Sequence, residues 1–266
     1  MKLFYRKYGE GPPLVILHGL YGSSDNWVSI ARKISGYYTV YLPDQRNHGQ
    51  SPWSDIIDYD SMSIDLFEYV SGLGLKRFFL AGHSMGGKTA VNFAIKWPEM
   101  IDGLLIADIL PFSNEERKSA AFNEHHEMLT AITGIDVLKA VSRTEVDRLL
   151  AVKIHSDKVR SFILKNLQRD SENKFSWRLN ARALLDNLDK ITEGLPYLSG
   201  DYQQITGFPV LFLKGENSDY ISSKNYSDII RLFPAAEIRV IKDAGHWLHA
   251  DNPGAVSEAF LDLLNL

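Results

Sequence analysis

Cysteine is absent from this 266-residue sequence, so disulfide bonds, thiolate metal sites and a cysteine nucleophile are excluded. Long hydrophobic runs are missing too, since no stretch approaches the roughly 20 apolar residues that a membrane-spanning helix needs. The initial segment Met1–Arg6 lacks the apolar core of a signal peptide. From these absences we expect a cytoplasmic protein with no membrane span.

An excess of positive charge is also lacking. The chain has 29 Lys and Arg residues against 33 Asp and Glu residues, which gives a formal net charge of -4. Because no basic patch of the density that nucleic-acid binding needs is visible, we expect no nucleic-acid partner. Apolar residues make up 45% of the chain, which is ordinary for a globular protein. The length suits one large α/β domain, or a core with an inserted lid.

Apolar, strand-like runs alternate with helical patterns in the first part of the chain, and the alternation returns near its end. Buried strands are predicted at Leu14–Leu17, Thr39–Leu42, Phe78–Ala81, Gly103–Ala107, Pro209–Leu213 and Ile238–Ile241. Helices are predicted near Trp27–Lys33, Met62–Gly72, Gly87–Lys96, Ser222–Leu232 and Pro253–Leu264. Continuous apolar strands separated by helices predict an α/β fold with a mostly parallel sheet and helices on both faces.

The middle of the chain has almost no strand signal. It carries helical stretches at Ala121–Ile132, Val146–Val152, Lys158–Leu167 and Ala181–Leu188. We therefore predict a core formed by residues 1–111 and 205–266, with a helical cap of residues 112–204 inserted over the carboxyl edge of the sheet. A separate helical domain is the alternative, which the return of the strand and helix pattern after the block disfavours.

The segment Gly82–Gly86 reads Gly-His-Ser-Met-Gly and follows the apolar run Arg77–Ala81. A helical pattern, Gly87–Ala94, comes next. A strand, a sharp turn and a helix form the context in which such a sequence makes a nucleophile elbow, with the serine exposed at the tip of the turn. Ser84 is therefore the predicted nucleophile.

A serine hydroxyl needs a base, and the base needs an acid that orients it. His246 is the predicted base, because it lies in a loop after the final strand and before the last helix. Two aspartates are candidates for the acid: Asp108 follows the strand beside the elbow strand, and Asp219 follows the strand Pro209–Leu213. Since neighbouring strands lie about 4.8 Å apart, either loop can reach the histidine. We prefer Asp108, with Asp219 as the alternative.

An oxyanion site needs two donors in place before the reaction. The backbone N–H of Met85, the residue after the nucleophile, is the predicted first donor. The N–H of Leu20, in the glycine-containing segment His18–Gly22, is the predicted second donor. The residues that we expect to line the substrate pocket are His18, Tyr21, Phe112, Trp177 and Trp247.

Four motifs in order resemble those of the α/β-hydrolase-fold serine esterases, and most of all the YbfF-type esterase and thioesterase branch. The motifs are His18–Ser23, Arg46–Ser51, Gly82–Lys88 and Gly245–Asp251, and the likeness spans nearly the whole chain, including the cap segment Phe175–Asn180. The resemblance implies an eight-stranded sheet with a helical cap. It implies roles for Ser84, His246, Leu20 and Met85, and it places the acid at Asp108, although most of the superfamily places it one strand later.

The function that the resemblance implies is cleavage of small-molecule acyl esters or thioesters by a Ser-His-Asp triad through an acyl-enzyme, without metal or cofactor. The same fold and triad also serve lyases, carbon–carbon hydrolases and haloperoxidases, so the fold does not decide among these reactions. A non-catalytic small-molecule receptor is a further alternative. The sequence leaves the oligomeric state open.

Overall fold

The structure is a computed structural model that describes residues 1–113, 115–195, 198 and 203–266. Seven strands form one sheet in the order β1-β3-β2-β4-β5-β8-β9. All neighbours run parallel except β1, which pairs antiparallel with β3 at the edge. The strands are β1 (Tyr5–Tyr8), β2 (Pro13–Leu17), β3 (Thr39–Pro43), β4 (Phe78–His83), β5 (Ile101–Ala107), β8 (Val210–Gly215) and β9 (Ala236–Ile241).

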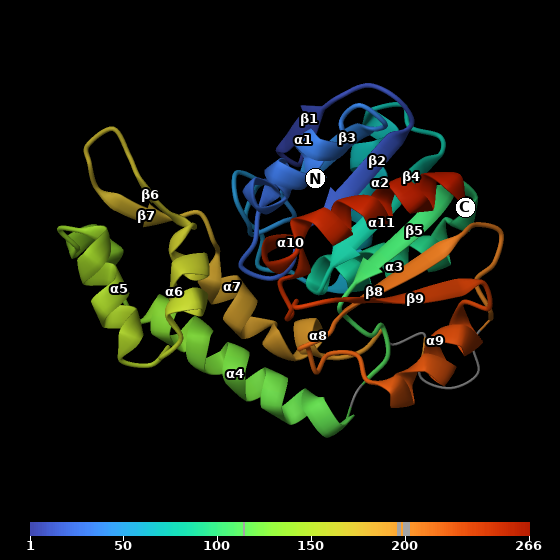
Figure 1. Cartoon of the computed structure of the whole chain (residues 1–266). Helices are drawn as coiled ribbons and strands as arrows, with labels where there is room; N and C mark the ends of the chain where they lie inside the picture. Colours follow the sequence, from blue (N-terminus) through green and yellow to red (C-terminus); the bar gives the residue numbers. More distant parts are fainter. Residues whose placement is uncertain (114, 196–197, 199–202) are drawn as a thin grey trace.

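Helices cover both faces of this sheet (Figure 1). The helices α1 (Val28–Ile34) and α11 (Pro253–Asn265) pack on one face, while α2 (Tyr59–Gly72), α3 (Met85–Lys96) and α9 (Tyr226–Leu232) pack on the other. Strand β2 shows why the strands are apolar throughout: Leu14 and Ile16 belong to the core on one face, and Val15 and Leu17 to the core on the other. The predicted mostly parallel sheet with helices on both faces is thus confirmed.

Two details of the sheet differ from expectation. The resemblance implied eight strands, whereas the described residues form seven in this sheet. The sequence also did not predict β1, because its residues Tyr5–Tyr8 alternate between exposed and half-buried positions and contain no apolar run. Such a strand lies at the sheet edge, where only one neighbour is needed.

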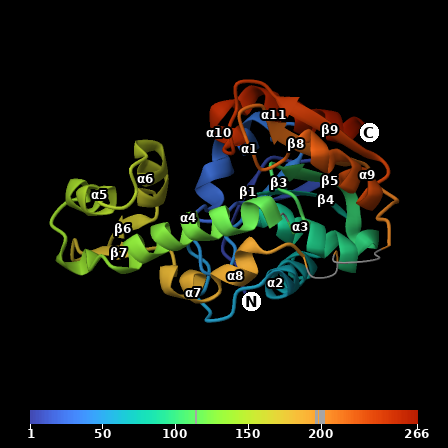
Figure 2. The ribbon, with the colours of Figure 1, turned by 90° about the horizontal axis from the view of Figure 1, so that it is seen from below.

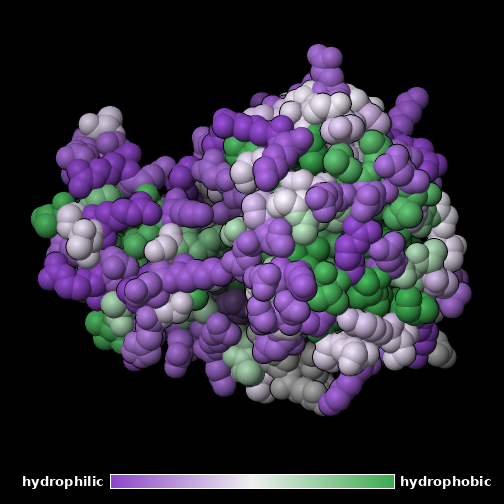
Figure 3. Space-filling model, viewed as in Figure 1, coloured by the Kyte–Doolittle hydropathy of each residue, from purple (hydrophilic) through white to green (hydrophobic). Residues whose placement is uncertain are grey.

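The chain between β5 and β8 leaves the sheet. It contains α4 (Glu115–Thr133), α5 (Arg143–Ala151), α6 (Asp157–Leu164), α7 (Ala181–Asp186), α8 (Leu188–Thr192), and the hairpin formed by β6 (Leu167–Arg169) and β7 (Phe175–Trp177). Figures 1 and 2 show α5, α6 and the hairpin projecting from the body that holds the sheet. In Figure 3 hydrophilic residues dominate the visible surface of this projecting part. The division into a core and a cap of residues 112–204 stays a prediction.

The expectation of an inserted segment made of helices alone was wrong at the hairpin. The helix predicted at Lys158–Leu167 ends at Leu164, and Leu167 begins β6. Two strands of three residues are too short to produce a periodic hydrophobic signal. Short 3-10 helices span Ser24–Trp27, Pro98–Met100, Val137–Lys139 and Ser223–Asn225, and the short helix α10 spans Leu248–Asp251.

None of the helices that the structure describes combines the length and apolar character that crossing a bilayer requires.

The carboxyl ends of β2, β4, β5, β8 and β9 lie along one edge of the sheet, because these strands run parallel. Chemistry-bearing side chains that follow these strands are therefore brought to the same edge.

Candidate active site

Ser84 lies in the sharp turn between β4 and α3. Its backbone has φ 52° and ψ -119°, outside the regions that serine ordinarily adopts. The turn is tight because Gly82 and Gly86 let main chains pass closely: a Cβ on Gly82 would meet the carbonyl oxygen of Gly86 at 2.1 Å. The N–H groups of Gly87 and Lys88 donate to the Ser84 carbonyl and start the helix at once. The local geometry is that of a nucleophile elbow.

Asp108 occupies the matching place on the next strand. In the pairing of β4 with β5, His83 lies opposite Ala107. The residues that follow, Ser84 and Asp108, therefore lie at the same end of two neighbouring strands. The Asp108 carboxylate is 0% exposed. It accepts hydrogen bonds from the Gly215 N–H at 3.0 Å, from the Ser218 hydroxyl, and from His246. Three donors offset the cost of burying this charge.

The imidazole of His246 is held by this carboxylate. Its Nδ1 lies 2.8 Å from Oδ2 of Asp108, and the side chain is 21% exposed. With Nδ1–H donating to the carboxylate, Nε2 is the nitrogen left to accept a proton. Asp219, the alternative acid, is exposed, so the geometry favours Asp108 as the partner of His246.

Two aromatic side chains that were not predicted to act here also fix His246. The Tyr220 ring stacks on the imidazole, with centroids 3.7 Å apart and planes 13° apart. His83 Nε2–H donates to the His246 carbonyl oxygen at 2.7 Å, and burial lowers the pKa of His83 well below its usual value. Neither role could be read from the sequence, because both depend on loops that meet only in the folded chain.

The predicted oxyanion donors border the serine. Met85 is the first residue of α3, where a helix has no internal acceptor for its N–H. Leu20 lies in the loop after β2, which turns sharply at Tyr21 (φ 62°). Leu20, Met85 and Ser84 line one small cavity of about 50 Å³. Their assignment as oxyanion donors stays a prediction.

A larger cavity of about 250 Å³ opens at the serine and the histidine. It lies between the sheet edge and the helices α4 and α6, and its walls are largely apolar. The lining residues include Ser84, His246, Tyr21, Met128, Phe162, Tyr220 and Trp247. Trp247 and Phe162 also border an adjoining groove of about 620 Å³ between α1 and α6. Ser84 and His246 thus face one space that can hold a small organic substrate.

The predicted pocket residues fall into two groups. Tyr21 and Trp247 line the 250 Å³ cavity, and Phe112 lines a small cavity that adjoins the one at Ser84. His18 and Trp177 lie outside the linings of these cavities. The expectation for His18 is corrected: its Nδ1 bonds to the Gly19 carbonyl and its Nε2 accepts from the Gln45 N–H, so the ring shapes the loop. Trp177 sits in the hairpin strand β7, against the apolar core.

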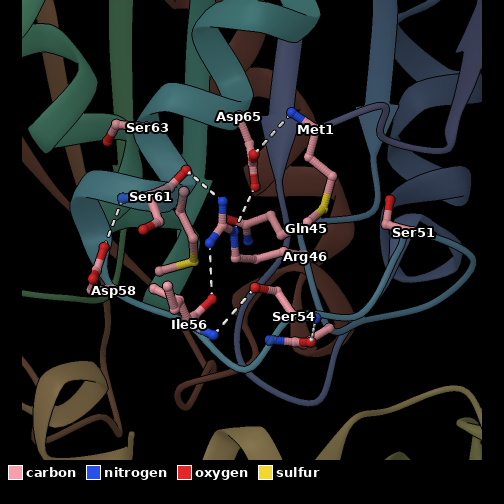
Figure 4. Close-up of polar contacts among 12 residues, drawn as sticks. Met1, Gln45, Arg46, Ser51, Ser54, Ile56, Asp58, Ser61, Ser63 and Asp65 are labelled. Atoms are coloured by element: carbon pink, nitrogen blue, oxygen red, sulfur yellow. Dashed lines mark hydrogen bonds and ion pairs between the residues drawn. The ribbon is translucent and has the colours of Figure 1, made fainter.

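Each of the three guanidinium nitrogens of Arg46, near this edge, donates a hydrogen bond to a protein group. Its Nε donates to Asp65 at 2.6 Å, and its other nitrogens donate to the carbonyls of Ile56 and Ser61 (Figure 4). The amino group of Met1 reaches the same carboxylate at 3.2 Å (Figure 4). Arg46 therefore braces the loop after β3.

Across the described ranges, no group of three or more His, Asp or Glu side chains is arranged to hold a metal ion.

Comparison with known proteins agrees with this geometry. The sequence profile of the alpha/beta hydrolase fold matches residues 12–253. The chain is 36% identical over 252 residues to the sn-1-specific diacylglycerol lipase ABHD11 of Danio rerio, covering 92% of this chain and 76% of that protein. It is 32% identical over 255 residues to Esterase YbfF of Escherichia coli, covering 95% and 93%. The solved structure of a marine microorganism esterase superposes with a TM-score of 0.90 at 40% identity, covering 98% of this chain and 99% of that one.

Proposed function

We propose that this chain, which belongs to the alpha/beta hydrolase family, is a serine hydrolase that cleaves acyl esters or thioesters through an acyl-enzyme on Ser84. Relatives and a solved structure named as esterases or lipases support ester hydrolysis. The observation that carries the mechanism is the hydrogen bond from His246 to the buried Asp108, next to a serine at the tip of an elbow. Together these residues form the nucleophile, base and acid of a triad.

In the first half of the reaction, His246 Nε2 takes the Ser84 proton while Ser84 Oγ attacks the carbonyl carbon. The N–H groups of Leu20 and Met85 donate to the oxyanion of the tetrahedral intermediate. Asp108 stabilises the imidazolium that forms, and it fixes the ring so that Nε2 faces the reaction. The intermediate collapses when His246 protonates the leaving alcohol or thiol.

In the second half, water gives a proton to His246 and attacks the acyl carbon of the ester on Ser84. The same two N–H groups stabilise the second oxyanion. Collapse releases the carboxylic acid and returns the proton to Ser84. The 250 Å³ cavity accommodates a small substrate, and the adjoining groove beside Trp247 offers room for a larger leaving group. A thioester substrate would react by the same steps, because these need only a leaving group that His246 can protonate.

The test is the turnover number of Ser84→Ala with p-nitrophenyl esters and acyl thioesters of increasing chain length. We expect a loss of about 10⁶-fold, as measured for serine knock-outs in other triads. If wild type hydrolyses the series readily and Ser84→Ala keeps a near-normal turnover number, the covalent mechanism is contradicted. Failure of the wild type on every ester and thioester would instead favour another reaction of this fold.

A further inference from the structure

Lys88 is a buried cation beside the proposed nucleophile to which the mechanism gives no role. It lies four residues after Ser84 on α3, about 6 Å further along the helix axis. The residue is 5% exposed. It lines the small cavity that also contains Ser84, Leu20 and Met85, and a second one that adjoins it.

The groups that surround the ammonium are mostly neutral. Nζ donates to the main-chain carbonyls of Thr192 and Glu193 at the end of α8, and it lies 5.5 Å from the centroid of the Tyr59 ring. The Glu193 carboxylate pairs with Lys118 at 2.8 Å. Within the part of the chain that the structure describes, no carboxylate forms an ion pair with Lys88. Two carbonyls and an aromatic face compensate a buried ammonium only in part.

Burial lowers the pKa of Lys88 to about 7, although the charge of Glu193 opposes this shift. An anion placed in the adjoining cavity would favour the charged form of the amine and would form a charge-assisted hydrogen bond with it. The remaining walls of the two small cavities are largely apolar and include Ile109 and Ala121. Their other polar side chains include His125 and Thr192 and, in the second cavity, Lys118, which pairs with Glu193.

Size limits what can enter. Each of the two cavities has a volume of about 50 Å³, so together they admit only a few non-hydrogen atoms. A carboxylate attached through a short chain to the scissile carbonyl would fit these dimensions. A bulky anion such as a nucleotide would not fit.

We propose that Lys88 and the two small cavities form a carboxylate subsite one helical turn from Ser84, so that the preferred substrates are half-esters of short dicarboxylic acids. This inference rests on the proposed hydrolase function of Ser84. Binding the free carboxylate against Lys88 positions the ester carbonyl at the elbow. Lys88 is then a residue that determines specificity, while Ser84, His246 and Asp108 carry out the chemistry.

The experiment compares matched pairs: monomethyl and dimethyl esters of malonic, succinic and glutaric acid. For wild type we expect kcat/KM for at least one half-ester to exceed that for its diester by about tenfold or more, the effect of one good charge-assisted contact. In Lys88→Met this ratio should fall to one or below, since the neutral diester gains relative to the charged half-ester. In Lys96→Met, which removes a lysine of the same helix that binds Asp60, the wild-type ratio should remain.

The outcomes separate the two proposals. If wild type hydrolyses none of these esters or the p-nitrophenyl series, the hydrolase function fails. If it hydrolyses them without preferring a half-ester, or if Lys88→Met keeps the preference, the carboxylate subsite is overturned.

A second measurement covers the case in which Lys88→Met does not fold. Succinate and glutarate should inhibit hydrolysis of an uncharged ester by the wild-type enzyme competitively and more strongly than the uncharged diamides succinamide and glutaramide do. Equal inhibition by the dicarboxylates and the diamides would also overturn the subsite.

Discussion

At the scale of single residues, two backbone conformations stand out at the proposed site. Ser84 and Asp108 have φ angles of 52° and 51°, in the left-handed region where residues other than glycine are uncommon. Such conformations cost on the order of 1–3 kcal/mol each and collect at functional sites. Here both occur directly after paired residues of adjacent strands, and they turn the serine and the carboxylate towards one edge of the sheet.

The choice of acid can be tested at this scale. Asp108→Asn should lower kcat for ester hydrolysis by about 10⁴-fold, because an amide in place of the carboxylate holds the imidazole in the wrong tautomer. Asp219→Asn is the matched control, because Asp219 lies in the same loop as Ser218, whose hydroxyl donates to Asp108. It should keep near-normal kcat, since Asp219 is exposed. Steady-state kinetics on one p-nitrophenyl ester measures both. Comparable losses in the two variants would contradict the assignment of Asp108.

Single residues also show most clearly which parts of the site can be predicted from the sequence. Ser84 and His246 are predicted from a motif and a loop position, and the fold brings both to one cavity. Asp108 and Asp219 each follow a buried strand, so residue patterns left both open, and only the hydrogen bond to His246 separates them. The roles of Ser218, Tyr220 and His83 depend on contacts between distant loops, which no local pattern encodes.

At the scale of elements, the elbow depends on the close packing of α3 against β2. A Cβ on Gly86 would meet the carbonyl oxygens of His18 and Leu17 at 2.5 and 2.6 Å. Both are main-chain atoms, so the helix itself would have to shift. The same contact places Met85 and Leu20 together, and the helix position and the oxyanion geometry are therefore linked.

Gly86→Ala should lower the free energy of unfolding by roughly 1–3 kcal/mol, the usual cost of overpacking, and should reduce kcat as well. The control is Gly72→Ala at the end of α2, where an added Cβ meets nothing within 4 Å. That variant should be neutral or more stable by about 0.5–1 kcal/mol, because alanine restricts the unfolded chain. Urea denaturation measures both. A Gly86→Ala protein as stable and active as wild type would refute the tight packing.

The elements themselves could be predicted where they are long or apolar. The strands at the centre of the sheet and the helices that cover it have clear periodic patterns. Strand β1 and the hairpin of β6 and β7 could not be predicted, because an edge strand with alternating polar residues and two strands of three residues lack such a signal. Their pairing partners, not their own sequences, decide their conformation.

At the scale of the whole molecule, buried neutral histidines link stability to pH. Burial lowers the pKa of His18 and of His249 to about 4 and that of His48 to about 3. In the unfolded chain these residues bind protons near pH 6.5. The unfolded state therefore binds more protons than the native state between these values, and stability is lost as pH falls from about 6.5 towards 4.

The free energy of unfolding should accordingly fall between pH 7 and pH 4.5, with His18 alone contributing up to roughly 3 kcal/mol over its range. Urea titrations followed by tryptophan fluorescence at several pH values measure this slope. His18→Gln should reduce the slope, whereas His126→Gln, at an exposed position of α4, should leave it unchanged. A stability that stays constant or rises towards pH 4.5 would contradict the burial of neutral imidazoles.

The central claim is that Ser84 forms a covalent acyl intermediate with the help of His246 and Asp108. Rapid acid quench during hydrolysis of p-nitrophenyl acetate, followed by peptide mass spectrometry, tests it most directly. We predict one acetyl group on the peptide that contains Ser84 in wild type, and none in Ser84→Ala. An acetyl group trapped at another residue, or normal turnover by Ser84→Ala, would contradict the account.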